Sequence, residues 1–201
     1  LETNIGKGGA VKEGLKFVKS KRTVRGAMLH LVLLYSLLAA LYVFAISLAS
    51  KIEVLGPEAF GTLLAISGIG MALGAIVIAQ IGHRYSRRRL TVSGLGAIAC
   101  SLVFLGQALG NLPFTFSFCG ILGVGAALVA IPAQTTIQED TPESQRGRIF
   151  GLQNNLINIA LSLPLVLAGT LITAFDVGPS LRILAAVAIL SALLERPWKR
   201  C

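Results

Sequence analysis

Neutral polar side chains at helical spacing form the clearest chemical pattern in this 201-residue sequence. Asn154, Asn158 and Ser162 are four residues apart, which places all three on one face of a helix. The segment around them is otherwise apolar, and an amide that faced hydrocarbon would lose its hydrogen-bond partners. We therefore expect this stripe to face other helices or a wet cavity.

A second pattern is aromatic. Tyr35 and Tyr42 are seven residues apart in an apolar segment and share one helix face. Two aromatic rings that line an apolar cavity would suit amphiphilic or drug-like molecules. Packing in the protein core, or anchoring at a membrane interface, is the alternative for this pair.

Groups that could perform catalysis are missing from the apolar segments. All nine Asp and Glu residues fall in loops or terminal segments, and the two histidines, His30 and His83, are far apart. The three cysteines form no Cys-x-x-Cys pair. An intramembrane enzyme needs buried carboxylates, an activated nucleophile or a metal motif. The sequence therefore predicts no enzyme, no catalytic residues, no metal and no cofactor.

The composition indicates a chain whose solvent is largely lipid. Hydrophobic residues make up 54% of the chain and charged residues only 13%, against about a quarter charged in ordinary soluble domains. This balance excludes a disordered tail, a coiled coil and most water-soluble enzymes.

Six apolar stretches follow a polar, basic beginning. A helix that spans the hydrocarbon needs about 20 residues; the first five stretches meet that length and the sixth is short. We expect an all-α membrane protein with six transmembrane helices in one domain (residues 28–194), between a basic cytoplasmic linker (1–27) and a cytoplasmic tail (195–201). The stretches are residues 28–49, 59–81, 90–109, 112–133, 152–174 and 181–194.

Basic residues are divided unevenly between the two sides of this arrangement. Sixteen of the 18 lysines and arginines lie in alternate connecting segments, and only Lys51 and Arg182 lie in the others. Cytoplasmic loops of membrane proteins carry such an excess. We therefore expect a multi-pass protein of the inner (plasma) membrane with both termini cytoplasmic. The net charge of +9 then requires no nucleic-acid partner.

Glycines and a short amphipathic segment add two expectations. Gly70 and Gly74 form a Gly-x-x-x-Gly pair, and further glycines of the second and fourth stretches should also allow close helix packing; they are Gly61, Gly68, Gly120, Gly123 and Gly125. Residues 11–25, if helical, place apolar side chains on one face among lysines. This segment either lies among anionic headgroups or is a solvated linker.

Two basic loops carry a resemblance to a known family. The connection after the second stretch contains Arg84, Arg87 and Arg88, and guanidinium groups there can bind helix carbonyls, carboxylates or lipid phosphates. It resembles the short loop of the major facilitator superfamily, Gly-x-x-x-Asp-Arg-x-Gly-Arg-Arg, with His83 in place of the aspartate. Its arginines could hold one helical bundle to another in one conformation and release it in the other.

The loop after the fourth stretch carries the more specific match. Pro142, followed by Arg146, Gly147 and Arg148, resembles the family's connection between its tenth and eleventh spans. Arg146 and Arg148 are expected to anchor the fifth stretch at the interface.

The resemblance covers residues 24–194 and implies the second six helices of a twelve-helix transporter. The implied partners are the bilayer, the N-terminal six-helix half and a small-molecule substrate. In the family the fifth of these helices lines the central cavity, so Asn154 and Asn158 become candidates for the pathway. We expect a secondary active transporter that exports amphiphilic or drug-like molecules; a six-span membrane scaffold that does not transport is the alternative.

Overall fold

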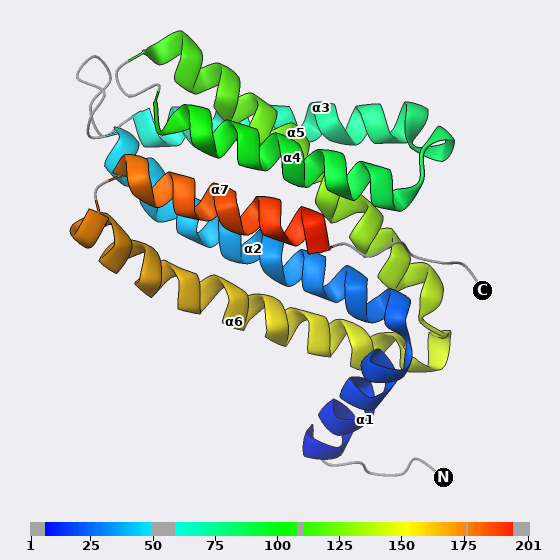
Figure 1. Ribbon diagram of the computed structural model, residues 1–201. Coiled ribbons are helices and arrows are strands. Elements are labelled where there is room, and N and C mark those ends of the chain that lie inside the picture. Colours follow the sequence, from blue (N-terminus) through cyan, green and yellow to red (C-terminus); the bar gives the residue numbers. More distant parts are fainter. Residues whose placement is uncertain (1–6, 50–58, 108–110, 176, 195–201) are drawn as a thin grey trace.

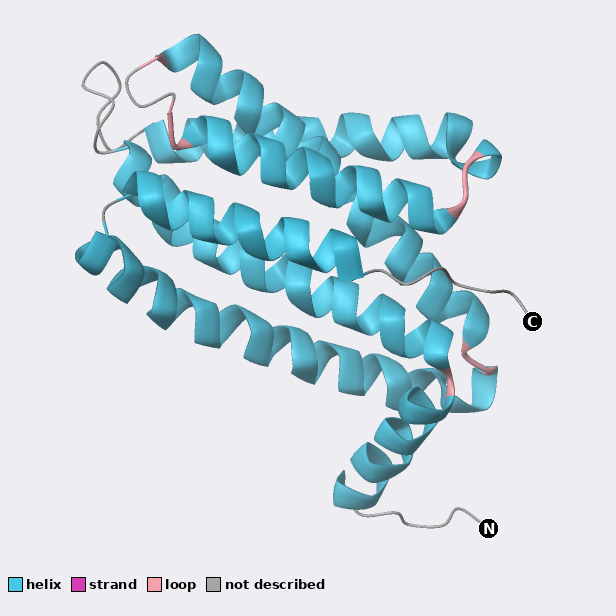
Figure 2. Cartoon of the chain, in the orientation of Figure 1, coloured by secondary structure: helices cyan, strands magenta, loops and turns pink. Residues whose placement is uncertain are grey.

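Helices account for the architecture of the described residues. The computed structural model describes residues 7–49, 59–107, 111–175 and 177–194, and no strand occurs in these ranges (Figure 2). The α-helices, labelled in Figure 1, are α1 (Lys7–Ser20), α2 (Arg22–Ala49), α3 (Ala59–Ile81), α4 (Arg87–Leu105), α5 (Leu112–Asp140), α6 (Glu143–Phe175) and α7 (Val177–Leu194). A short 3₁₀ turn, η2 (Gly82–Arg84), follows α3.

Several helices extend beyond the apolar stretches at the end of the bundle that carries the basic loops, which we call the basic end. α2 begins at Arg22, α5 continues to Asp140 and α6 begins at Glu143. A helix satisfies its own backbone hydrogen bonds, so it can continue into the polar headgroup region without cost to its backbone. The apolar stretches therefore marked where the hydrocarbon ends, whereas the helices end later.

The starts of two helices are fixed by local side chains. Ser86 precedes α4, and its hydroxyl accepts a hydrogen bond from the backbone N–H of Arg89 (3.3 Å). Asn111 precedes α5 and accepts from the backbone N–H of Phe114 (3.5 Å), with Pro113 in the first turn. Both arrangements satisfy N–H groups that a helix cannot bond internally.

Four helices of the described residues are long and apolar enough to cross a membrane. They are residues Arg22–Ile46, Phe60–Arg84, Arg87–Leu105 and Leu112–Asp140; Val177–Leu193 is apolar but shorter. The structure thus confirms an all-helical membrane fold. Six crossings, with α6 and α7 as the fifth and sixth, stay a prediction.

Helix α5 is central to the packing. It contacts α3, α4 and α2, while α2 also contacts α6, and α4 contacts α7. In Figure 1, α2, α6 and α7 lie together on one side, and α3, α4 and α5 on the other.

Glycines allow α5 to approach its neighbours closely. A Cβ atom at Gly94 of α4 would lie 2.7 Å from the carbonyl oxygen of Gly125, and one at Gly70 of α3 would overlap the Gly120 carbonyl. The packing role predicted for Gly70 is therefore confirmed, as are those of Gly74, Gly123 and Gly125. At Gly61 and Gly68 an added Cβ would meet no atom of the described residues within 4 Å, so the structure shows no close packing at these two glycines.

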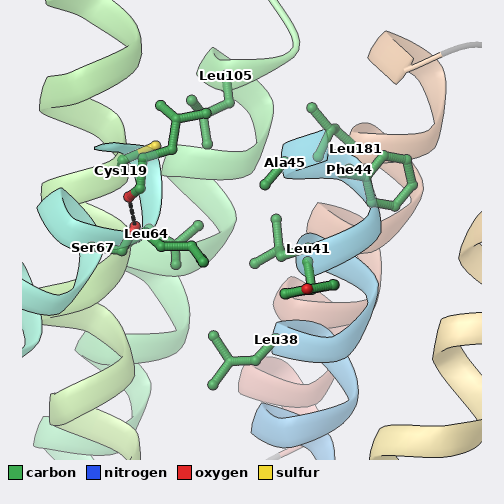
Figure 3. Close-up of a pocket in the computed structure, with 12 residues that line it drawn as sticks. Leu38, Leu41, Phe44, Ala45, Leu64, Ser67, Leu105, Cys119 and Leu181 are labelled. Atoms are coloured by element: carbon green, nitrogen blue, oxygen red, sulfur yellow. Dashed lines mark hydrogen bonds between the residues drawn. The ribbon is translucent and has the colours of Figure 1, made fainter. Parts of the chain in front are cut away.

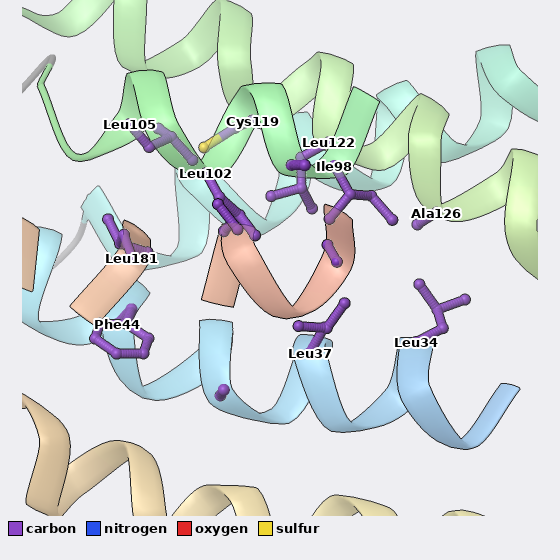
Figure 4. Close-up of a cluster of buried hydrophobic side chains, with 14 of the residues drawn as sticks. Leu34, Leu37, Phe44, Ile98, Leu102, Leu105, Cys119, Leu122, Ala126 and Leu181 are labelled. Atoms are coloured by element: carbon purple, nitrogen blue, oxygen red, sulfur yellow. The ribbon is translucent and has the colours of Figure 1, made fainter. Parts of the chain in front are cut away.

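Two clusters of buried side chains fill the bundle. The larger joins α2, α4, α5 and α7 through residues such as Leu34, Leu102 and Leu122 (Figure 4). The second lies at the basic end, where Val18 of α1 packs with side chains of three other helices. Examples are Met28 of α2, Ile137 of α5 and Ile149 of α6. The second cluster therefore attaches α1 to the bundle.

Replacing Gly94 by Ala should separate α4 from α5, because the new methyl group cannot fit against the Gly125 carbonyl. We expect a loss of about 1–3 kcal/mol in the free energy of unfolding, measured by thermal unfolding of the purified protein in detergent. Gly96→Ala is the control on the same helix, since Gly96 is exposed with open space around it. Equal stability of the two variants would contradict the close contact.

Candidate functional site

An apolar cavity of about 280 Å³ opens at the end of the bundle opposite the basic end. Its walls come from the last turns of α2 and α4 and the first turns of α3, α5 and α7, because all these ends meet there. Figure 3 shows α2 facing α3 and α5 across the cavity. The lining residues are Leu38, Leu41, Tyr42, Phe44, Ala45, Leu63, Leu64, Ser67, Leu105, Cys119, Leu122 and Leu181.

Among the described residues, the cavity lining has few polar groups and no charged side chain. Ser67 donates its hydroxyl to the Leu63 carbonyl (2.9 Å), and the Cys119 thiol lies within hydrogen-bonding reach of Ser67. An ionised group would lose its hydration here without gaining a partner, whereas an apolar group would be removed from water. The cavity is therefore suited to an uncharged or apolar part of a ligand.

The two predicted tyrosines lie in different places. Tyr42 lines the cavity and packs edge-on against Phe60, with ring centroids 5.1 Å apart. Tyr35 is partly buried and packs against the second cluster, toward the basic end. Although their spacing puts them on one helix face, two turns of α2 separate them, so only Tyr42 contributes to the cavity.

The predicted amide stripe lies on an open face of α6. Asn154, Asn158 and Ser162 are all exposed, and the Ser162 hydroxyl donates to the Asn158 carbonyl (2.8 Å). None of the three lines the apolar cavity. Two amide side chains exposed on a helix that packs against α2 need a polar neighbour or water if α6 lies in the membrane. Their place in a substrate pathway stays a prediction.

The arginine loop after α3 makes a contact within the bundle. The Arg87 guanidinium donates to the Thr136 hydroxyl (2.9 Å) and forms an ion pair with Glu139, both on α5. Glu139 thus supplies the carboxylate that the loop itself lacks at His83. We call the contact of Arg87 with Thr136 and Glu139 the α4–α5 clamp. It closes one wall of a polar cleft of about 720 Å³ at the basic end.

The other predicted loop arginines have separate positions. Arg84 and Arg88 are exposed, and Arg88 lines the polar cleft. Arg146 lies 3.4 Å from Glu143 one turn earlier on α6. Arg148 forms an ion pair with Glu13 of α1 (2.5 Å). The two arginines of α6 are therefore held in place by carboxylates.

The sequence pattern missed several contributors to these sites. Ser67 and Cys119 enter the cavity from α3 and α5, and Glu13 and Glu139 are the partners of Arg148 and Arg87. No spacing in the sequence connects residues on different helices. The sequence offered one indication for Glu139: it lies in a connection that we predicted on the same side of the membrane as Arg87.

The apolar helices of the described residues define a multi-pass membrane protein, and the cavity between them is lined almost entirely by apolar side chains. Comparison with known proteins places it further: the sequence profile of the Major Facilitator Superfamily matches residues 9–198. The chain belongs to this superfamily of transporters. No solved structure gave a significant match.

Curated relatives agree with the family. The chain is 29% identical over 203 residues to the uncharacterized MFS-type transporter YfiS of Bacillus subtilis (strain 168), covering 95% of this chain and 46% of YfiS. It is 29% identical over 118 residues to the multidrug efflux pump Tap of Mycolicibacterium fortuitum, covering 59% of this chain and 29% of Tap. The chain thus spans less than half the length of these relatives.

Replacing Arg87 by Ala should weaken the α4–α5 clamp. The Arg87 and Glu139 side chains are 45% and 57% exposed, and an exposed ion pair with one additional hydrogen bond contributes only about 1 kcal/mol. We expect the free energy of unfolding to fall by that amount, measured by thermal unfolding. Arg89→Ala, on the same exposed turn, should leave it unchanged. A loss of the same size in both variants would contradict a specific role for Arg87.

Proposed function

We propose that this chain forms the C-terminal half of a secondary active transporter that exports small amphiphilic or drug-like molecules. The observation that carries the proposal is the apolar cavity, whose described lining includes Tyr42 and no charged side chain. Membership of the Major Facilitator Superfamily supports transport. The partial similarity to a multidrug efflux pump supports the direction and the substrate class.

In this proposal the six helices α2–α7 cross the membrane and pair with an N-terminal half that completes the pathway. The substrate binds by burying its apolar part among the leucines of the cavity, which contributes roughly 25 cal/mol for each Å² of apolar surface removed from water. The polar part of an amphiphile would then meet hydroxyl and amide groups. Asn154, Asn158 and Ser162 are the candidates for this polar wall.

The α4–α5 clamp has the strength that a moving contact requires. A half-exposed ion pair is worth about 1 kcal/mol or less, so thermal motion and substrate binding can break and re-form it. Arg87 would then pair with Glu139 in one state of the transporter and lose that pairing in another, while the glycine contacts keep α4 packed against α5. A deeply buried ion pair would be too costly to open in each cycle.

Filling the cavity should stop export in the intact protein that contains this chain. In efflux-deficient bacteria loaded with Nile red, Leu41→Trp should lower the initial rate of dye loss at least fivefold, because the indole occupies the cavity. Leu190→Trp is the control, since Leu190 of α7 is 58% exposed and outside the cavity. Equal rates for the two variants, or no dye loss above cells without the protein, would contradict the proposal.

Asn158→Leu tests the amide stripe in the same assay. If Asn158 lines the pathway, an apolar side chain of similar size should reduce export about tenfold or more, since one polar partner of the substrate is lost. The amount of protein in the membrane, measured by immunoblot, separates this effect from misfolding. Unaltered export at equal abundance would remove Asn158 from the pathway while leaving the cavity proposal intact.

A further inference from the structure

Helix α1 lies across the direction of the other helices. In Figure 1 it leaves the bundle beside the start of α6 and runs across the common direction of α2 and α6. It lies at the basic end, where α2 and α6 begin. When the bundle crosses a bilayer, a helix in this position lies along the membrane surface, at the depth of the lipid headgroups.

One face of α1 is fixed to the bundle. Gly14 and Val18 are buried, and a Cβ at Gly14 would lie in ordinary contact with the Arg148 carbonyl and with Leu152 of α6 (3.7 Å each). The Glu13 carboxylate binds the Arg148 guanidinium on the same side. These contacts set the rotation of α1 about its own axis.

With this rotation, the face of α1 that points away from the bundle is basic and partly apolar. Lys16 and Lys19 are exposed, and Leu15, one turn before Lys19, is 42% exposed. Glu13 is the only acidic residue in α1, and its carboxylate is already paired with Arg148. The turn into α2 adds further exposed basic side chains, which are Lys21, Arg22 and Arg25. The outward face therefore combines positive charge with one apolar side chain.

We propose that α1 is an interfacial helix that binds acidic phospholipid headgroups through Lys16 and Lys19, with Leu15 inserted between the lipids. The charge is complementary to that of anionic lipid, and basic residues near such a surface each contribute about 1 kcal/mol. The apolar side chain and the long lysine stems can enter the boundary between headgroups and acyl chains. This surface is independent of the transport cavity at the opposite end of the bundle.

The test measures which lipid lies next to α1. The chain, with Cys100, Cys119 and Cys201 replaced by Ser, carries Leu15→Cys labelled with the fluorophore NBD and is placed in nanodiscs of mixed phosphatidylcholine and phosphatidylglycerol. Quenching is compared between spin-labelled phosphatidylglycerol and spin-labelled phosphatidylcholine at the same mole fraction. We expect phosphatidylglycerol to quench at least about fivefold more effectively.

The lysines are then removed or screened. Lys16→Gln/Lys19→Gln should lower the quenching ratio at least about twofold, since Lys21, Arg22 and Arg25 remain. About 0.5 M salt with the unaltered lysines should bring the ratio close to one, because surface charges are screened there. Arg182→Gln, at the other end of the bundle, should leave the ratio unchanged. A ratio near one with both lysines present, a ratio that is not lowered without them, or protection of the fluorophore from both lipids would each overturn the proposal. None of these results depends on transport.

Discussion

The exclusion of charge from the membrane interior is the constraint that determines where the ion pairs and the cavity of this helical bundle lie. Every Lys, Arg, Asp and Glu in the described part of the chain lies on α1, in a loop, or within two turns of a helix end. Charges gathered at helix ends can meet only there, which is why Arg87 pairs with Glu139 and Arg148 with Glu13 at the basic end. At the opposite end, the described residues that line the cavity carry no charge.

Association of the helices then has to come from close packing. Lipid is as apolar as leucine, so burial of leucine between helices gives little advantage within the membrane. Glycines instead bring the backbone of α5 against α3 and α4, as at Gly94 and Gly125. This close packing also sets how α3 lies against α5, and so positions Ser67 and Cys119 on the wall of the cavity.

The sequence was sufficient for what depends on local pattern and insufficient for what depends on contacts between helices. Apolar length predicted the helices, with the second stretch matching α3 at both ends, because hydropathy reports the hydrocarbon directly. Helical spacing placed Tyr35 and Tyr42 on one face but could not tell that only Tyr42 reaches the cavity. Gly68 and Gly70 look alike in sequence, yet only Gly70 meets α5, since the rotation of α3 is set by its neighbour.

The roles proposed for the cavity, the clamp and the interfacial helix all require six membrane crossings with the basic end in the cytoplasm. In a chain whose native cysteines are replaced by Ser, single cysteines at Ser86, Gln145 and Asn111 can be labelled with a membrane-impermeant maleimide. With the basic end in the cytoplasm, Ser86→Cys and Gln145→Cys should react only after the cells are permeabilised, whereas Asn111→Cys should react in intact cells. Labelling of positions 86 and 145 from opposite sides of the membrane would contradict this topology.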